Sequence, residues 1–210
     1  MNALFHRPEE PFRKENEWSE TTYRDRARDI EAVLDALPAT TELAKIPMDL
    51  KRIGIAGHSL GGYTALGLAG AWPAWKDPRI KAVLALSPYC SPFIVKGDLR
   101  HLNVPVMYQG GTRDRGITPT VRRPGGAYDL SSAPKYFVEF DGAGHLAWTN
   151  LGHEYRALIV RYSVAFFERY LKDATDPDPL APLTVKPLPK DVSAVESQPD
   201  QPSPALAGGR

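Results

Sequence analysis

Apolar residues along this chain fall into short continuous runs and longer periodic stretches. Four short runs are rich in Val, Ile, Leu, Met or aromatic residues: Lys51–Ala56, Ile80–Leu86, Val104–Tyr108 and Tyr136–Phe140. Each is followed within two residues by Gly, Ser or Asp. Nearly continuous apolar character over so few residues is typical of strands buried on both faces. The runs therefore predict four strands of a parallel sheet.

Longer stretches between and around these runs have helical periodicity. In Ser19–Leu37, apolar residues recur at helical spacing and Pro38 ends the pattern. Tyr63–Ala71 consists of small and apolar residues, and Glu154–Leu171 is amphipathic. Helices alternating with strands predict an α/β fold, with a mostly parallel sheet covered by helices on both faces.

Both ends of the chain lack this pattern. Residues 1–18 are charged and carry Pro8 and Pro11, which predicts an irregular arm. Residues 173–210 are rich in proline and contain no aromatic residue. This composition predicts a disordered tail. The expected folded domain therefore spans residues 19–172.

Composition excludes several classes of protein. The 210 residues include 26 Lys and Arg against 25 Asp and Glu, a net charge of +1, so no basic surface for nucleic acid is expected. The single cysteine, Cys90, cannot form an internal disulfide. No apolar stretch is long enough to span a bilayer, and the first residues do not form a secretory signal. A cytoplasmic location is expected.

The clearest catalytic motif is Gly57–Gly61, which has the pattern G-x-S-x-G. It lies between the predicted strand Lys51–Ala56 and the predicted helix Tyr63–Ala71. A sharp strand-to-helix turn would lift the Ser59 hydroxyl above the end of the sheet as a nucleophile. We expect Gly57 and Gly61 to be small because neighbouring backbones come too close for a side chain. The backbone N–H of Leu60 would point to a developing oxyanion.

A serine nucleophile needs a base, and in this architecture the base follows the acid in the chain. His145 fits best because it lies in a flexible loop directly after the strand Tyr136–Phe140. The other histidines are His6, His58, His101 and His153. His58 flanks the nucleophile inside the turn, and His153 is expected to cap the last helix.

The acid is expected after the preceding strand. Asp114 follows the glycine turn at the end of Val104–Tyr108 and would hold the His145 ring. Asp98, Asp129 and Asp141 are less well placed alternatives. No His, Cys, Asp and Glu cluster has metal-ligand spacing, so neither a metal nor a cofactor is expected.

With these three elements in order, the chain resembles the α/β-hydrolase superfamily. The segments GHSLGGYTAL, GGTRD and DGAGHLAW are similar to the branch that contains dienelactone-hydrolase-like proteins, platelet-activating-factor acetylhydrolases and polyester-degrading cutinases. Dienelactone hydrolases carry cysteine where this chain has Ser59, so their specificity does not carry over. The resemblance implies hydrolysis of carboxylic esters through an acyl-enzyme.

The chain departs from that family before the nucleophile. The family places several strands there, and one of the loops supplies a second oxyanion N–H. Here 52 residues precede Ile53 and contain no such strand, so the fold would be truncated to its C-terminal strands. Lys51–Ala56 would then be a sheet edge. Either residues 2–12 or another chain would cover it, or the sequence is a fragment or a minimal variant of the fold. We expect a homodimer through this edge, or aggregation.

Two hypotheses for function follow. The first is a serine esterase acting on a small ester, with His58, Tyr89, Phe93 and Trp148 lining the substrate site. Thioesters, peptides and lactones would use the same residues. The second is a catalytically weak or inactive hydrolase-like protein that pairs with a partner through its sheet edge. A fluorophosphonate separates the two because it labels only an activated serine.

Overall fold

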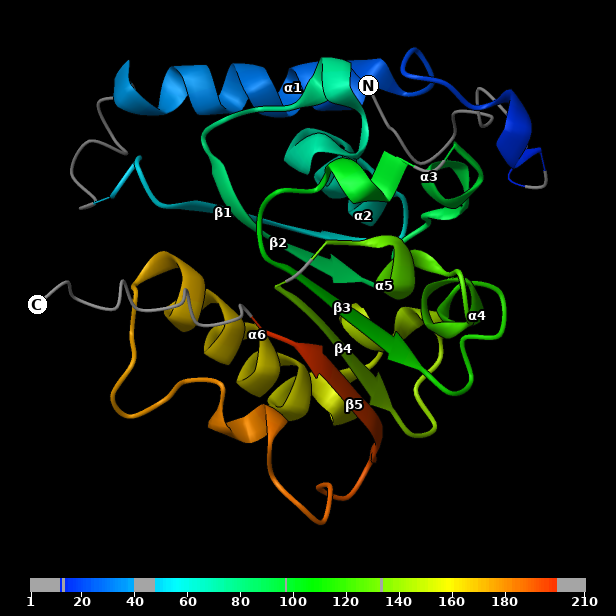
Figure 1. Ribbon diagram of the computed structural model, residues 1–210, viewed down its shortest axis with the longest axis vertical. Coiled ribbons are helices and arrows are strands. Elements are labelled where there is room, and N and C mark those ends of the chain that lie inside the picture. The colour runs from blue at the N-terminus through cyan, green and yellow to red at the C-terminus, as the bar shows by residue number, and fades with distance from the viewer. Residues whose placement is uncertain (1–11, 13, 40–47, 97, 133, 200–210) are drawn as a thin grey trace, which may run out of the picture.

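A computed structural model describes residues 12, 14–39, 48–96, 98–132 and 134–199 (Figure 1). Its five-stranded sheet has the order β1-β2-β3-β4-β5. The strands are β1 (Ile53–His58), β2 (Ile80–Leu86), β3 (Val106–Gly111), β4 (Lys135–Phe140) and β5 (Val192–Gln198). β1 to β4 are parallel and β5 is antiparallel to β4. The predicted mostly parallel sheet is confirmed.

Helices follow the strands in alternation. The α-helices are α1 (Arg24–Ala36), α2 (Leu60–Leu66), α3 (Ser91–Lys96), α4 (Thr118–Arg122), α5 (Ala127–Leu130) and α6 (Arg156–Leu171). A π-helix, η5 (Gly67–Ala71), extends α2. The 3-10 turns are η2 (Glu15–Glu17), η3 (Leu37–Ala39), η6 (Pro73–Trp75), η7 (Asp98–His101), η8 (His145–Trp148), η9 (His153–Tyr155) and η10 (Ala181–Leu183).

The sheet separates two hydrophobic cores because successive side chains of a strand point to opposite faces. On one face, Val83, Ala85 and Tyr108 pack under α1, α2 and α3. On the other face, Leu84 and Met107 pack against α6, as Figure 1 shows. Both faces of the central strands are therefore buried, as their continuous apolar sequence predicts.

The end of the expected N-terminal arm is anchored in the core. Trp18 is fully buried, and its ring packs against the rings of Tyr63 and Tyr89. The Trp75 indole N–H donates to the Glu20 carbonyl at 2.7 Å, which fixes the chain just before α1. Apart from η2, the described part of residues 12–18 contains no helix or strand, and its end packs in the core. Residues 1–11 lie outside the described residues, so the expected irregular arm stays a prediction.

The proline-rich C-terminal segment also differs from the expectation. Residues 173–199 run back along the sheet, where Leu183 and Val192 are buried in the α6 core. β5 then pairs with β4, and Ser193 Oγ donates to Glu139 Oε2 at 2.7 Å. The disorder prediction is therefore wrong for this part of the tail, because a few apolar residues and the open edge of β4 suffice to hold it. Residues 200–210 lie outside the described part.

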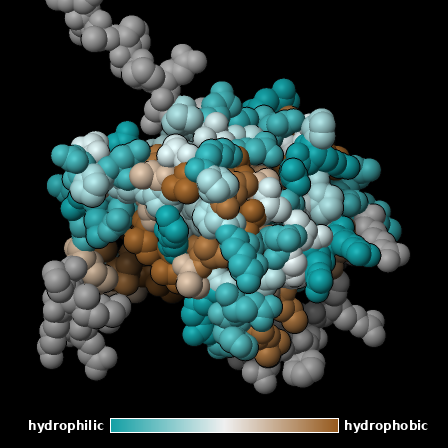
Figure 2. Space-filling view, turned by 90° about the horizontal axis from the view of Figure 1, so that it is seen from below, coloured by the Kyte–Doolittle hydropathy of each residue, from teal (hydrophilic) through white to brown (hydrophobic). Residues whose placement is uncertain are grey.

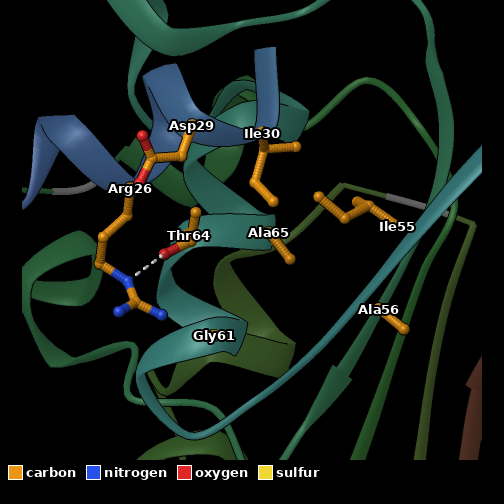
Figure 3. Close-up of a pocket in the computed structure, with 8 residues that line it drawn as sticks. All are labelled: Arg26, Asp29, Ile30, Ile55, Ala56, Gly61, Thr64 and Ala65. Carbon is orange, nitrogen blue, oxygen red and sulfur yellow. Dashed lines mark hydrogen bonds between the residues drawn. The ribbon is translucent and has the colours of Figure 1, made fainter. Parts of the chain in front are cut away.

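β1 lies at the opposite edge of the sheet and, among the described residues, pairs only with β2. The described residues before Ile53 contain no strand. Ile53 and Ile55 are half-buried against the core under α1. A groove of about 260 Å³ opens between α1, α2 and β1 (Figure 3), where Arg26 Nε donates to Thr64 Oγ1 at 3.1 Å. Among the described residues, β1 is therefore an edge strand, as predicted.

Exposed apolar side chains occur on the face that carries α6. Figure 2 shows apolar residues gathered on the molecule as seen from below. In α6, Val160 and Val164 are about half exposed, at 51% and 47%. In the part of the chain that the structure describes, no helix is long and apolar enough to cross a membrane. The expected cytoplasmic location stays a prediction.

Candidate active site

Ser59 lies on the turn between β1 and α2. Its φ of 56° and ψ of −119° are rarely adopted by non-glycine residues, so surrounding contacts must hold this backbone. Ser59 N–H donates to the Leu86 carbonyl at 3.0 Å, and its carbonyl accepts the N–H groups of Gly62, Tyr63 and Tyr89. The predicted strand–serine–helix turn is confirmed, and β2 helps to hold it.

The glycines of this turn have different roles from those expected. A Cβ on Gly57 would lie 2.1 Å from the Gly61 carbonyl oxygen, so Gly57 must be glycine. A Cβ on Gly61 would meet no atom within 4 Å, whereas one on Gly62 would lie 2.5 Å from Pro88 Cβ. The expectation that Gly61 has no space for a side chain is therefore wrong. The Gly61 backbone is what a Cβ on Gly57 would strike, and Gly62 is the second residue of this turn at which a Cβ would collide with a neighbour.

The three residues expected to form a triad lie together above the carboxyl ends of the strands. Ser59 Oγ is 2.9 Å from His145 Nε2, and His145 Nδ1 is 3.1 Å from Asp114 Oδ2. The Asp114 side chain is buried, while His145 is about one-third exposed. If Nδ1 carries the proton and donates to Asp114, Nε2 is free to accept the Ser59 proton. The arrangement suits general-base activation of serine.

Ser87, which sequence reasoning did not single out, completes this cluster. It directly follows β2, is fully buried and has a φ of 42°. Its hydroxyl donates to Asp114 Oδ2 and lies 3.0 Å from His145 Nδ1. Its position in the sequence, directly after the strand that lies between those preceding Ser59 and Asp114, is the one feature that could have indicated its role.

His58 and Trp148 support the histidine loop. His58 Nε2 donates to the His145 carbonyl oxygen at 2.8 Å, and the two imidazole rings are 4.7 Å apart. Burial lowers the pKa of His58, which favours the neutral form of the ring. The Trp148 indole N–H donates to Gln109 Oε1 at 3.1 Å. Both residues, expected at the substrate site, make contacts that position the loop.

A pocket of about 390 Å³ opens at Ser59. Its walls include Tyr89, Ile117, Phe12 and Glu15. The Tyr89 hydroxyl donates to the Phe12 carbonyl oxygen at 2.6 Å, and their rings meet edge to face at 4.8 Å. The N-terminal segment therefore forms one wall of the candidate substrate pocket, a feature that the sequence did not reveal.

Phe93 and Cys90 belong to the core. Phe93, which we expected to line the substrate site, is fully buried and stacks on Tyr63 at 4.9 Å, so that expectation is wrong. α3 turns the Phe93 side chain inward. Burial raises the pKa of the Cys90 thiol to about 12, so the cysteine stays protonated and unreactive.

Asp129 and Asp141, two of the alternative acids, bond to other groups. Asp129 accepts the Gly125 N–H at 2.9 Å, and Asp141 accepts the Thr112 hydroxyl at 3.1 Å. The exposed residues His101 and His153 belong to η7 and η9. His6 lies outside the described residues, and the structure does not describe the side chain of Asp98. Where the chain is described, no group of three or more His, Cys, Asp and Glu could hold a metal ion.

A mostly parallel sheet with a serine on the strand-to-helix turn and a histidine and an aspartate at later strand ends defines an α/β-hydrolase-like fold. A sequence model of one family within that class, described as PET hydrolase-like (PETase), matches residues 19–194. The chain belongs to this family.

Individual relatives agree with that family. Cutinase est2 of Thermobifida alba is 30% identical over 152 residues, which cover 71% of this chain and 46% of the relative. Cutinase 2 of Thermobifida cellulosilytica is 29% identical over 153 residues, covering 71% and 53%. Cutinase cut1 of Thermobifida fusca is 29% identical over 153 residues, covering 71% and 44%. The chain spans about half the length of these relatives.

Proposed function

We propose that this protein is a serine hydrolase that cleaves carboxylic esters through an acyl-enzyme. The observation that carries the proposal is the continuous hydrogen-bonded chain from Ser59 Oγ through His145 to the buried Asp114. Relatives named cutinases and the PET hydrolase-like family support an ester as substrate.

In the first half-reaction, Ser59 Oγ attacks the ester carbonyl carbon while its proton passes to His145 Nε2. Asp114 holds the ring and stabilises the imidazolium that forms. The tetrahedral intermediate then collapses, and the leaving alcohol takes the proton from His145 Nε2. Water then attacks the carbonyl carbon of the acyl-enzyme while its proton passes to His145 Nε2. Collapse of the second tetrahedral intermediate releases the carboxylic acid, and the proton returns from His145 to Ser59 Oγ.

The oxyanion of the intermediate needs backbone donors. Leu60 begins α2 directly after the nucleophile, so its N–H is proposed as the first donor. The described residues before β1 contain no strand whose loop could supply a second donor. Loss of one oxyanion donor costs about 100- to 1,000-fold in turnover, so we expect slow catalysis unless another group supplies it.

The pocket at Ser59 favours small, uncharged aromatic or aliphatic esters. Phe12, Tyr89 and Ile117 give it an apolar and aromatic wall. Glu15 lies at the same pocket and would repel a substrate that carries a carboxylate. We therefore propose neutral esters of short acyl chains or aromatic acids as the substrate class.

A non-catalytic interaction protein is the second candidate, and the open edge at β1 favours it. Hydrolysis of a series of aryl esters separates the candidates. We expect measurable turnover that falls at least 1,000-fold in Ser59→Ala. Equal rates for the native chain and Ser59→Ala would refute the esterase proposal and leave the interaction protein.

A further inference from the structure

The three proposed catalytic residues come from the ends of β1, β3 and β4, which leaves the end of β2 between them. Ser87 occupies that position. It follows Leu86, the last residue of β2, and its N–H donates to the Gln109 carbonyl of β3 at 2.7 Å. Its fully buried side chain contacts the proposed acid and base from β2, the strand between β1 and β3.

The hydroxyl of Ser87 contacts both partners of the proposed ion pair. It donates to Asp114 Oδ2, and its oxygen lies 3.0 Å from His145 Nδ1, which is itself 3.1 Å from the same carboxylate oxygen. The three atoms form a closed triangle. The His145 Nδ1 proton therefore has two acceptors, and Asp114 Oδ2 has two donors.

We propose that Ser87 is a positioning residue that sets the orientation and charge of the Asp114–His145 pair. Donation from its hydroxyl stabilises the Asp114 carboxylate and selects the oxygen that faces His145. Its oxygen also limits rotation of the imidazole ring, so that Nε2 stays aimed at Ser59. This role rests on the proposed hydrolase function, but it makes a separate claim about the site.

The backbone of Ser87 supports a role for the side chain. A φ of 42° favours glycine, and a serine there adds conformational strain. The structure around this residue holds that conformation, with the hydroxyl aimed at the proposed acid. Strained backbone conformations are concentrated at active sites. A strained, buried serine in contact with the proposed acid and base therefore supports a functional role for its side chain.

Ser87→Gly is the sharpest variant because glycine adopts the positive φ without strain and removes only the side chain. We expect kcat for an aryl ester to fall about tenfold or more, with KM within about twofold, because a charge-assisted hydrogen bond is lost. Ser87→Ala should show the same kinetic changes with lower thermal stability.

The matched control is Ser131→Ala, which removes another buried hydroxyl, one that bonds Tyr108 and the Ala127 carbonyl. This variant should lose stability but keep kcat and KM. If Ser87→Gly retained the native kcat, or lost no more of it than Ser131→Ala does, Ser87 would have no positioning role.

A spectroscopic measurement tests Ser87 independently of turnover. The His145 Nδ1 proton should give a downfield proton NMR signal that shifts and exchanges faster in Ser87→Gly. An unchanged signal would overturn the role of Ser87. If the native enzyme lacked turnover but this signal responded as expected, the proposed hydrolase function would fail while the contact network stood.

Discussion

Ser59 depends on neighbours that tolerate its unusual backbone. Three N–H groups converge on its carbonyl oxygen, and Gly57 passes so close to Gly61 that no side chain fits between them. Close packing of backbone against backbone is hard to relieve, because neither chain can rotate away as a side chain can. The position of the nucleophile is therefore sensitive to one glycine in particular.

Substitution of the two glycines by alanine should have opposite effects. Gly57→Ala places a Cβ 2.1 Å from the Gly61 carbonyl and should lower the free energy of unfolding by about 2 kcal/mol or more. Gly61→Ala meets open space inside α2 and should raise it by up to about 1 kcal/mol. Urea unfolding measures both, and equal losses would contradict the geometry of the turn.

His58 gives the folded protein a pH-dependent stability. Burial lowers its pKa below the ordinary value of 6.5, so the unfolded chain binds a proton that the folded chain does not. Stability is therefore complete above the unfolded pKa and is lost as the pH falls from about 6.5 towards the folded pKa. Replacement by glutamine, which keeps an N–H donor, should remove this part of the loss.

Thermal unfolding of the native chain and His58→Gln between pH 5 and 8 measures the effect. The difference in Tm between them should change most below pH 6.5, in favour of the variant. Since the other histidines are common to both proteins, their contributions cancel. A constant Tm difference across this range would show that His58 does not supply the pH dependence.

Sequence reasoning was most successful where a residue type, its spacing and an adjacent strand agreed. Ser59, Asp114 and His145 each follow a continuous apolar run, and strand order brought them together. Phe93 also follows a strand, but a helix turns its ring into the core. Ser87 was missed because a lone serine after a strand has no distinctive spacing. Tertiary contacts alone distinguish these two cases.

Among the elements, the least predictable from sequence is β5. Its sequence, VSAVESQ, is mostly polar and lies between prolines, so neither composition nor periodicity predicts a strand. An edge strand needs few apolar residues because one face and one edge remain open to solvent. What fixes it is the pairing offered by β4 and the burial of Val192.

Removal of β5 should destabilise the sheet. A chain that ends after Asp191 loses the Val192 side chain and the β4 pairing, which should cost about 2 kcal/mol or more. A chain that ends after Pro199 keeps β5 and is the matched control. Urea unfolding of both should show the loss only in the shorter chain. Equal stability would mean that β5 contributes nothing to the fold.

At the scale of the whole molecule, the edge strand β1 has no part in the proposed chemistry beyond carrying Ser59 at its end. The edge strand has one paired side among the described residues, and the groove of Figure 3 lies beside it. Unpaired strand edges are templates for association with another chain. Pairing of β1 with another chain would satisfy the backbone groups of this edge.

We expect self-association through β1. Ala56 is exposed on this strand, so Ala56→Lys should place a charge at the edge and lower the fraction of dimer or aggregate. Ala32→Lys, on an exposed position of α1, adds the same charge away from the strand. Light scattering over a range of concentrations measures the state. A native chain that stays monomeric, or equal effects of both lysines, would exclude edge pairing.

The central claim is that the contacts of His145 and Asp114 make Ser59 nucleophilic. A fluorophosphonate probe tests this directly, with the modified peptide identified by mass spectrometry. We predict one label on Ser59, no label in Ser59→Ala and labelling at least tenfold slower in His145→Gln. A native, folded chain that takes up no label, or takes it up equally in Ser59→Ala, would contradict the account.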